Sequence, residues 1–152
     1  MQNFNPPYGP IWTNPANSPQ TAAMTDLTPD AIETRDLIRR VAAERVAPRA
    51  DAIDRTGEYP QDMFDLLKEL GVFTLPFPEA YGGRESVLAA CVATEELGRV
   101  CYNTGYLLVV QWTPFGAIMA AGTQAQRDHY LPGLASGDLR AVSHHSWMAA
   151  RH

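Results

Sequence analysis

The chain contains residue types that catalyse reactions in many proteins, but few of them occur at spacings that chemistry requires. Glu95 and Glu96 are adjacent, so on a helix their side chains point about 100° apart and cannot face each other as an acid and a base. We predict that one is exposed and that the other caps a helix or forms a salt bridge. Ser136 and Ser143 have no patterned base beside them.

Histidines and cysteines are also poorly placed for chemistry. His144, His145 and His152 lie close together near the end of the chain, but without i, i+4 spacing or a neighbouring carboxylate they make a poor metal-ligand set. Cys91 and Cys101 are ten residues apart on what reads as one helix. Because that spacing corresponds to about 15 Å along the axis, we expect free thiols on a core face rather than a disulfide.

The Gly82-Gly83 pair precedes an expected helix, but it lacks the glycine and lysine pattern of a phosphate-binding loop. It therefore predicts a turn. No catalytic constellation and no metal site are predicted from motifs alone.

The elements that would position these residues are helices. Apolar spacing predicts an all-α fold, a helical bundle of about five helices. Their expected starts are Thr28-Pro29, Pro60, Ser86, Asn103 or Thr104, and a capping box of Thr123 and Gln126. Pro48 should kink or end the first helix, and Gly71 and Gly137 should end the second and the fifth.

Burial can be predicted from the same pattern. Residues 72–77 are expected to be extended or to form a buried loop. The fourth helix is apolar on nearly all sides, which predicts that other helices enclose it. Tyr130, Leu131 and Leu134 are expected in the core. The expected buried face of the third helix comprises Val87, Ala90, Cys91, Thr94, Leu97 and Cys101.

Composition divides the chain into three parts. Residues 1–25 carry no charge and five prolines, which predicts a disordered tail, although translation from Met24 is an open alternative. Residues 26–140 form the expected helical domain, and residues 141–152 an irregular C-terminal tail.

Charge and hydropathy exclude several function classes. A net charge of −5 without a basic cluster argues against nucleic-acid binding. The apolar run over residues 106–121 contains Gln111, Thr113 and Pro114 and is shorter than the roughly 20 residues of a membrane span. No secretory signal opens the chain, and free thiols fit a reducing compartment, so a cytoplasmic location is expected.

Six short segments occur in an order and at a spacing that together resemble one family. They are Tyr59-Pro60, Leu70-Gly71, Pro78-Glu79-Ala80-Tyr81-Gly82-Gly83, Glu95-Glu96-Leu97-Gly98-Arg99, Gly122-Thr123-Gln124-Ala125-Gln126 and Tyr130-Leu131-Pro132-Gly133-Leu134-Ala135-Ser136-Gly137-Asp138. Over roughly residues 29 to 140, the chain resembles the N-terminal helical domain of the acyl-CoA dehydrogenase family.

The resemblance implies an FAD-dependent oxidoreductase that introduces an α,β double bond into acyl-CoA thioesters in fatty acid or related lipid catabolism. It implies transfer of electrons to an electron-transfer flavoprotein and a homo-oligomeric full-length enzyme. The fourth helix would lie along the acyl chain. The residues expected to face that chain are Gly105, Tyr106, Val109, Val110 and Thr113. The alternative is that these five residues only pack the bundle.

The sequence departs from the family in two places. Arg84-Glu85-Ser86 replaces a glycine-rich continuation that is usually one residue longer. After Ala141, the family continues into a strand and a Thr-Glu-Pro loop that contacts flavin and substrate, whereas residues 142–152 differ. A frameshift after Ala141 would account for this change.

On this reading, the β-domain, the second helical bundle and the catalytic carboxylate are missing. The chain is therefore expected to hold no catalytic residue, to bind no FAD and to be inactive alone. The alternative is a non-enzymatic helical module that binds a partner subunit or an acyl group.

Overall fold

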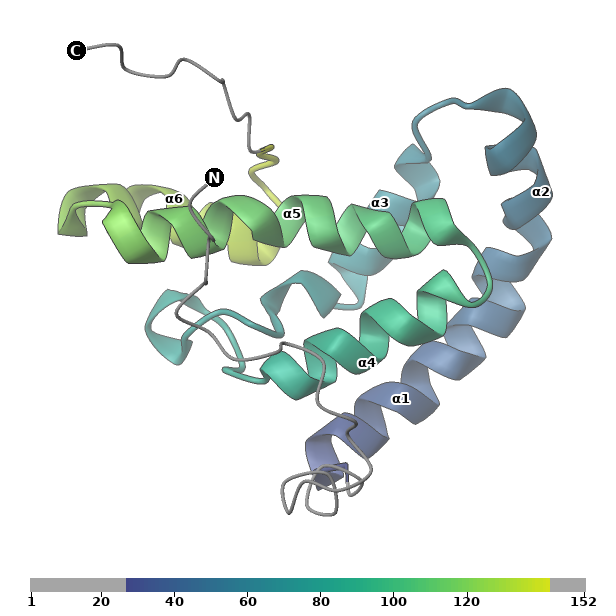
Figure 1. The fold of residues 1–152 in the computed structure, drawn as a ribbon, viewed down its shortest axis with the longest axis horizontal. Helices are drawn as coiled ribbons and strands as arrows, with labels where there is room; N and C mark the ends of the chain where they lie inside the picture. Colours follow the sequence, from purple (N-terminus) through teal and green to yellow (C-terminus); the bar gives the residue numbers. More distant parts are fainter. Residues whose placement is uncertain (1–26, 143–152) are drawn as a thin grey trace, which may run out of the picture.

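The computed structural model of the protein describes residues 27–142 (Figure 1), and the two predicted tails lie almost wholly outside this range. Within these residues the fold is all-α and contains no strand. The helices are α1 (Pro29–Val41), α2 (Ala47–Thr56), α3 (Gln61–Glu69), α4 (Val87–Gly98), α5 (Tyr102–Ala121) and α6 (Gln124–Ser136). Short 3-10 turns at Val72–Thr74 and Glu79–Tyr81 lie between α3 and α4.

The first two helices form one continuous rod. Thr28 caps α1 by accepting a hydrogen bond from the amide of Ala31, and a π-helical turn, Ala42–Val46, leads directly into α2. Pro48 therefore does not end the helix. It lies in the first turn of α2, just after the π-helical turn, where a proline is tolerated. The described residues thus contain five long helical rods, as the sequence predicted.

Most predicted boundaries are confirmed because they depend on local chemistry. Ser86 caps α4, and Thr123 and Gln126 form a capping box at α6. Gly71 and Gly137 adopt left-handed φ values of 67° and 74° at the ends of α3 and α6. The predicted cap of the fourth helix, Asn103 or Thr104, is wrong by two or three residues: the cap is Cys101, in an extended conformation, and α5 begins at Tyr102.

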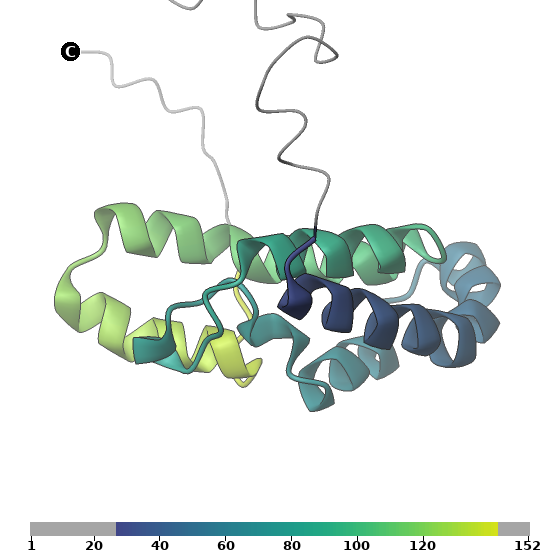
Figure 2. The same ribbon diagram turned by 90° about the horizontal axis from the view of Figure 1, so that it is seen from below.

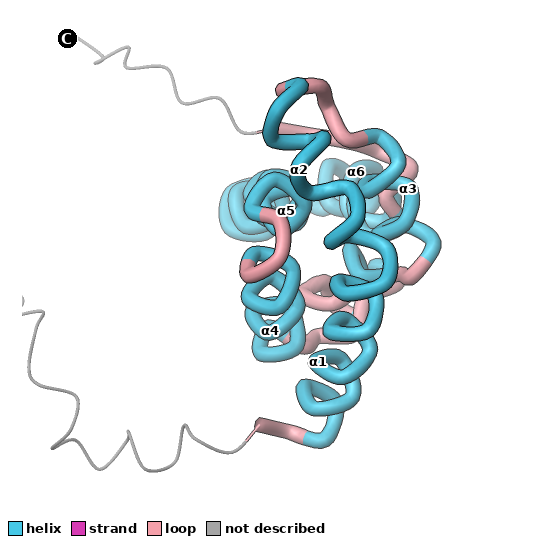
Figure 3. Tube along the Cα trace, turned by 90° about the vertical axis from the view of Figure 1, so that its right-hand side faces the viewer, coloured by secondary structure: helices cyan, strands magenta, loops and turns pink. Residues whose placement is uncertain are grey.

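The helices pack in the order α1 on α4, α4 on α5 and α5 on α6. In Figure 1, α5 runs along the long axis above α4, and Figure 2 shows α6 returning along one end of α5 while α1 and α4 occupy the other. Figure 3 shows α1 and α4 side by side beneath α5 and α2. This arrangement leaves one side of α5 without a helical neighbour.

The core consists of two clusters of buried residues. The larger one draws residues from each of the helices α1 through α5 and includes Ile38, Leu67, Phe73 and Leu108. The smaller one joins α6 to the turns after α3 and contains Phe77, Leu131, Leu134 and Ala135. Residues 72–77 therefore form a buried turn, with a 3-10 helix at Val72–Thr74. The alternative of an extended segment is wrong.

Three burial predictions are wrong. Tyr130 is 41% exposed, Cys91 is exposed and Val87 is 64% exposed. Helix α4 is apolar in more than one direction, and its buried face is the one that meets α1 and α5, made by Ala89, Ala90, Val92, Ala93, Glu96 and Leu97.

Candidate functional site

The adjacent glutamates of α4 have structural roles. Glu96 is buried and binds Arg39 of α1 through both carboxylate oxygens, each at 2.9 Å. This hydrogen bond raises the pKa of the Arg39 guanidinium above its ordinary value. Glu95 is exposed and pairs with Arg99, one turn along the same helix. The prediction of one exposed and one salt-bridged glutamate is confirmed, and neither carboxylate faces the other.

The cysteines do not share a helix. Cys91 lies in α4 and is exposed, whereas Cys101 is buried just before α5 and follows the end of α4 at Gly98. Both are free thiols. The prediction of one helix and one core face is therefore wrong, because the chain turns between the two residues.

The other candidates for chemistry are histidines and serines. Ser143, His144, His145 and His152 lie outside the described residues. Between residues 27 and 142, no three histidine, cysteine, aspartate or glutamate side chains are grouped as they would be around a metal ion. Ser136 hydrogen-bonds Asp138 and the carbonyl of Gly133, which makes it part of the end of α6.

The five residues predicted to face an acyl chain lie on different sides of α5. Gly105 faces α4. A Cβ at this position would lie 3.0 Å from the amide nitrogen of Gly98 and 3.3 Å from the carbonyl of Thr94. Gly105 therefore allows close helix packing and is not on the open side. Tyr106 and Val109 are 49% and 41% exposed, and Thr113 is also exposed. The predicted enclosure of α5 is wrong on this side.

Tyr106 and Val110 line a cavity of about 540 Å³ on one flank of α5. The opposite wall comes from the α2–α3 connection and from α3, and the segment after α6 closes one end. The lining residues are Ile53, Gly57, Glu58, Tyr59, Pro60, Phe64, Asn103, Tyr106, Leu107, Val110, Gln111, Arg140, Ala141 and Val142. Most of the inner wall is apolar, and the charged groups lie at the rim.

Val109 and Thr113 line an open groove of about 600 Å³ between α4 and α5. Its other residues include Val87, Cys91 and Trp112. The Thr113 hydroxyl donates to the carbonyl of Val109, one turn earlier, so it is already engaged. The groove and the cavity lie on either side of the exposed ridge formed by Tyr106 and Val109.

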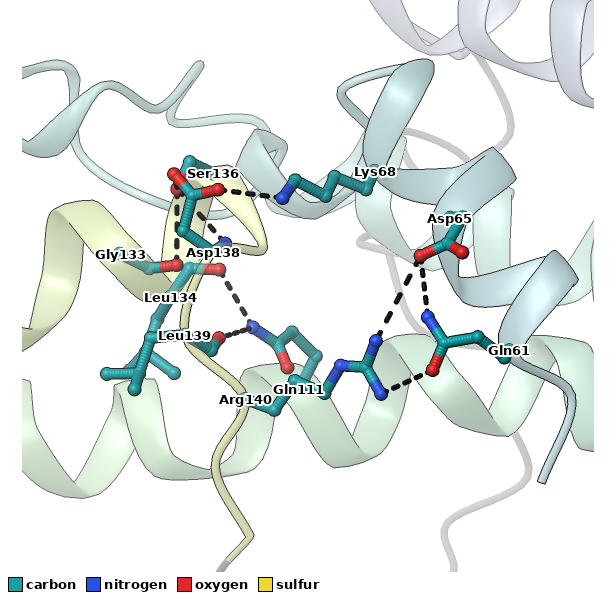
Figure 4. A network of polar contacts seen from close by, with 10 residues as sticks. All are labelled: Gln61, Asp65, Lys68, Gln111, Gly133, Leu134, Ser136, Asp138, Leu139 and Arg140. Atoms are coloured by element: carbon teal, nitrogen blue, oxygen red, sulfur yellow. Dashed lines mark hydrogen bonds and ion pairs between the residues drawn. The ribbon is translucent and has the colours of Figure 1, made fainter.

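The segment after α6 is fixed to α5 by a residue that motif reading missed. The side-chain amide of Gln111 donates to the carbonyls of Leu134 and Leu139, at 2.9 Å and 2.7 Å (Figure 4). The guanidinium of Arg140 stacks on the ring of Phe64, 3.9 Å from its centroid, and donates to Gln61. One feature of the sequence could have pointed to Gln111: it is the only amide side chain in the largely apolar run of residues 106–121.

A second set of surface contacts supports the same segment. Lys68 donates to Asp138 at 2.7 Å, as Figure 4 shows. This hydrogen bond and that from Ser136 lower the pKa of the Asp138 carboxyl. Asp62 has a lowered pKa for the same kind of reason, because Arg49 donates to its carboxylate.

Comparison with known proteins gives a consistent family assignment. Residues 28–138 match the model of the acyl-CoA dehydrogenase N-terminal domain. The probable acyl-CoA dehydrogenase YngJ of Bacillus subtilis is 36% identical over 115 residues, which cover 74% of this chain and 30% of that protein. The cyclohex-1-ene-1-carbonyl-CoA dehydrogenase of Geobacter metallireducens is 38% identical, over 71% of this chain and 29% of that protein.

A solved structure gives the same result. One chain from the study "Electron transferring flavoprotein of Acidaminococcus fermentans: Towards a mechanism of flavin-based electron bifurcation" is 31% identical, with a TM-score of 0.67 over 74% of this chain and 30% of that one.

The chain thus spans about 30% of the length of the curated relatives it matches. None of the helices described between residues 27 and 142 is long and apolar enough to cross a membrane. The match to the family model extends over the whole of the helical bundle, from the cap of α1 to the end of α6. The chain belongs to the acyl-CoA dehydrogenase family, and its helical bundle is the N-terminal domain of that family.

Proposed function

We propose that this chain is the N-terminal part of an FAD-dependent acyl-CoA dehydrogenase that forms the α,β double bond of an acyl-CoA thioester, in fatty acid or related lipid catabolism. The observation that carries the proposal is the exposed apolar side of α5, within the residues that match the family domain. Tyr106 and Val109 there are 49% and 41% exposed. In the longer enzyme this side of α5 would form one wall of a dry acyl-binding slot.

The proposed acyl-facing residues are Gly105, Tyr106, Val109, Val110 and Thr113, with different roles. Tyr106 and Val109 form the exposed ridge, Val110 and Thr113 lie on its two flanks, and Gly105 acts indirectly by holding α5 close to α4. Such a wall binds and orients the acyl group and excludes water from it. The proposal places no catalytic acid or base in this chain.

The described residues do not fit a flavin phosphate at the one glycine-rich turn. The amide of Gly83 already donates to the carbonyl of Pro78 at 3.0 Å, and a Cβ on Gly83 would lie 1.8 Å from the carbonyl oxygen of Phe77. Gly83 is therefore packed against backbone, and its amide is already used within the turn. We therefore derive no step through flavin, and we propose that FAD binds only in the longer enzyme and that this chain alone is inactive.

The same proposal names the partners and the place of the full enzyme. They are an acyl-CoA substrate, an electron-transfer flavoprotein as electron acceptor, and further copies of the enzyme in a homo-oligomer, in the cytoplasm. The net charge of −5 supports the absence of a nucleic-acid partner.

A chimeric enzyme tests the proposal. Residues 28–138 would replace the matching N-terminal domain of the Bacillus subtilis relative, and α,β-dehydrogenation of a series of acyl-CoA substrates would be measured. We expect a flavin-loaded, active chimera whose activity falls at least about tenfold with Val109→Asp, since a charge in an apolar slot is poorly solvated. The matched control, Glu79→Asp on the 3-10 turn Glu79–Tyr81, should leave the activity of the chimera unchanged. A folded, flavin-loaded chimera without activity would contradict the proposal.

The second candidate is a free-standing helical module that binds a partner subunit or an acyl group, which the same exposed side of α5 would serve. Reading the DNA that follows the codon for His152 separates the two. A β-domain and second-bundle sequence there, in any frame, favours the dehydrogenase. Unrelated sequence favours the module.

A further inference from the structure

The cavity beside α5 contains one buried polar group whose hydrogen-bonding capacity is half used. Gln111 is only 3% exposed and lines this cavity. Its Nε2 donates to two carbonyl oxygens, those of Leu134 and Leu139. Because both partners are acceptors, the nitrogen must point toward them, which fixes the orientation of the whole amide.

The amide oxygen of Gln111 is then turned the other way. Figure 4 shows it on the side of the side chain opposite the two carbonyls. Among residues 27–142, no donor makes a hydrogen bond to this Oε1. The fully buried side-chain oxygens without a partner among the described residues are those of Asp30 and Thr104, so Gln111 Oε1 keeps some accessible surface. It can therefore accept a hydrogen bond from a ligand that supplies a donor.

The rest of the wall defines what else the ligand must have. Ile53, Phe64, Leu107 and Val110 give the cavity an apolar interior, and a volume of about 540 Å³ is within the usual range of small-molecule sites, roughly 300–1,000 Å³. These walls favour a ring or a short branched chain over a polar body.

The rim does not favour a charged ligand. Arg140 and Glu58 lie there with opposite charges. The guanidinium of Arg140 is already engaged by Gln61 and by the ring of Phe64. Burial raises the pKa of the Tyr59 phenol above its ordinary value, so this group also stays neutral at pH 7.

We propose that this cavity binds a small uncharged molecule with an apolar ring or short chain and one N–H or O–H group, which donates to Gln111 Oε1. The site goes beyond the proposed acyl wall. It includes the α2–α3 connection and the segment after α6, and it is built from residues of this chain alone.

Two isosteric probes test the proposal on the full chain. Indole carries one ring N–H, and indene has the same shape without a donor. Each is titrated by calorimetry and by amide chemical-shift changes. We expect indole to bind about tenfold more tightly than indene, which corresponds to roughly 1.4 kcal/mol, at the upper end of the net contribution of one hydrogen bond. The shifts should centre on the residues around Val110 and Gln111.

Two variants locate the effect. Gln111→Leu should reduce the ratio of the two affinities about tenfold, so that it approaches one. Because this variant also removes two contacts of the segment after α6, Val110→Phe is made in parallel; by filling the cavity, it should weaken both probes at least about tenfold. The matched control is Val109→Phe, one residue away in the α4–α5 groove, which should leave both affinities unchanged.

The outcomes are distinct. Equal affinities for indole and indene in the unmodified chain, no binding of either probe, or equal losses in the Val109 and Val110 variants would each overturn the proposal. Because Tyr106 and Val110 belong to both the cavity and the proposed acyl wall, the two proposals are separated by what is measured. Affinity for the probes tests the cavity, and activity of the chimera with acyl-CoA tests the wall.

Discussion

Arg39 and Glu96 lie 57 residues apart in the chain and form a two-point ion pair between α1 and α4. The carboxylate side chain is only 8% exposed, whereas the guanidinium side chain is 50% exposed. The pair therefore provides the buried carboxylate with its hydrogen bonds while the positive charge keeps part of its hydration. The contact holds α1 against α4 in a fixed orientation.

Replacing this glutamate should destabilise the domain. We expect Glu96→Ala to lower the free energy of unfolding by about 1–2 kcal/mol, near the low end for hydrogen bonds to charged groups because the partner is half exposed. The control is Glu95→Ala, whose pair with Arg99 is exposed on both sides and should contribute below about 0.5 kcal/mol. Urea unfolding followed by circular dichroism measures both, and equal losses would contradict the structural role of Glu96.

Two glycines of α5 should respond to alanine in opposite directions. Gly105→Ala places a methyl group 3.0–3.1 Å from the backbone of Gly98 and should destabilise by about 1–3 kcal/mol, as overpacking does. Gly116→Ala meets nothing within 4 Å and should stabilise by about 0.5–1 kcal/mol through helix propensity. Thermal unfolding measures both effects. If the melting temperatures of the two variants shifted in the same direction, the close packing of Gly105 against α4 would be contradicted.

Glu85 adopts a left-handed conformation, with φ of 51°, within the segment 84–86 where the family resemblance led us to expect glycines. This conformation costs a residue other than glycine about 1–2 kcal/mol. Glycine removes that strain but gives the unfolded chain more conformational entropy, which offsets part of the gain. Glu85→Gly should therefore raise the free energy of unfolding by about 0.5–1 kcal/mol. Glu79→Gly serves as a control, because its φ is not positive, and should destabilise. Loss of stability in the Glu85 variant would show that its side chain makes a contact worth more than the strain.

The Thr104 hydroxyl is fully buried and has no hydrogen-bond partner among the described residues. Thr104→Val keeps the shape and removes the unpaired oxygen, so it should raise the free energy of unfolding by about 1 kcal/mol. Thr113→Val, on the exposed side of the same helix, should change it by less than about 0.5 kcal/mol. If calorimetry instead showed a loss at Thr104, a bound water or another donor must serve this hydroxyl.

The contact between Lys68 and Asp138 should make stability depend on pH in acid. The folded state lowers the pKa of Asp138, chiefly through the hydrogen bond from Lys68. Its contribution is therefore complete above the unfolded-state pKa of about 3.9 and is lost as the pH falls through the lower folded-state value. Asp138→Asn should reduce the slope of stability against pH below about pH 4. An unchanged slope in urea titrations across this range would contradict the assignment.

The sequence predicted the ends of the helices better than their faces. Ser86, Thr123 and Gly137 act on backbone groups within one turn, so their roles can be recognised locally. Tyr130 and Cys91 were placed in the core wrongly, because α4 and α6 are apolar in more than one direction and the neighbouring helices decide which side is covered.

The candidate site was only partly predictable for the same reason. The family resemblance predicted Tyr106 and Val110 as residues that face an acyl chain, which stays a prediction, and both line the cavity beside α5. Gln111 and Arg140 were missed. Their partners are 23 to 79 residues away in the sequence, and no local pattern reports a contact between α5 and a segment that returns after another helix.

Trp112 packs against both clusters of buried residues, and its indole N–H donates to the carbonyl of Phe73 at 2.9 Å. The two clusters therefore share one side chain and cannot separate without exposing it. As a consequence, α6 and the α1–α4 end of the bundle should open together, and amide hydrogen exchange in both should report a single cooperative unit rather than two.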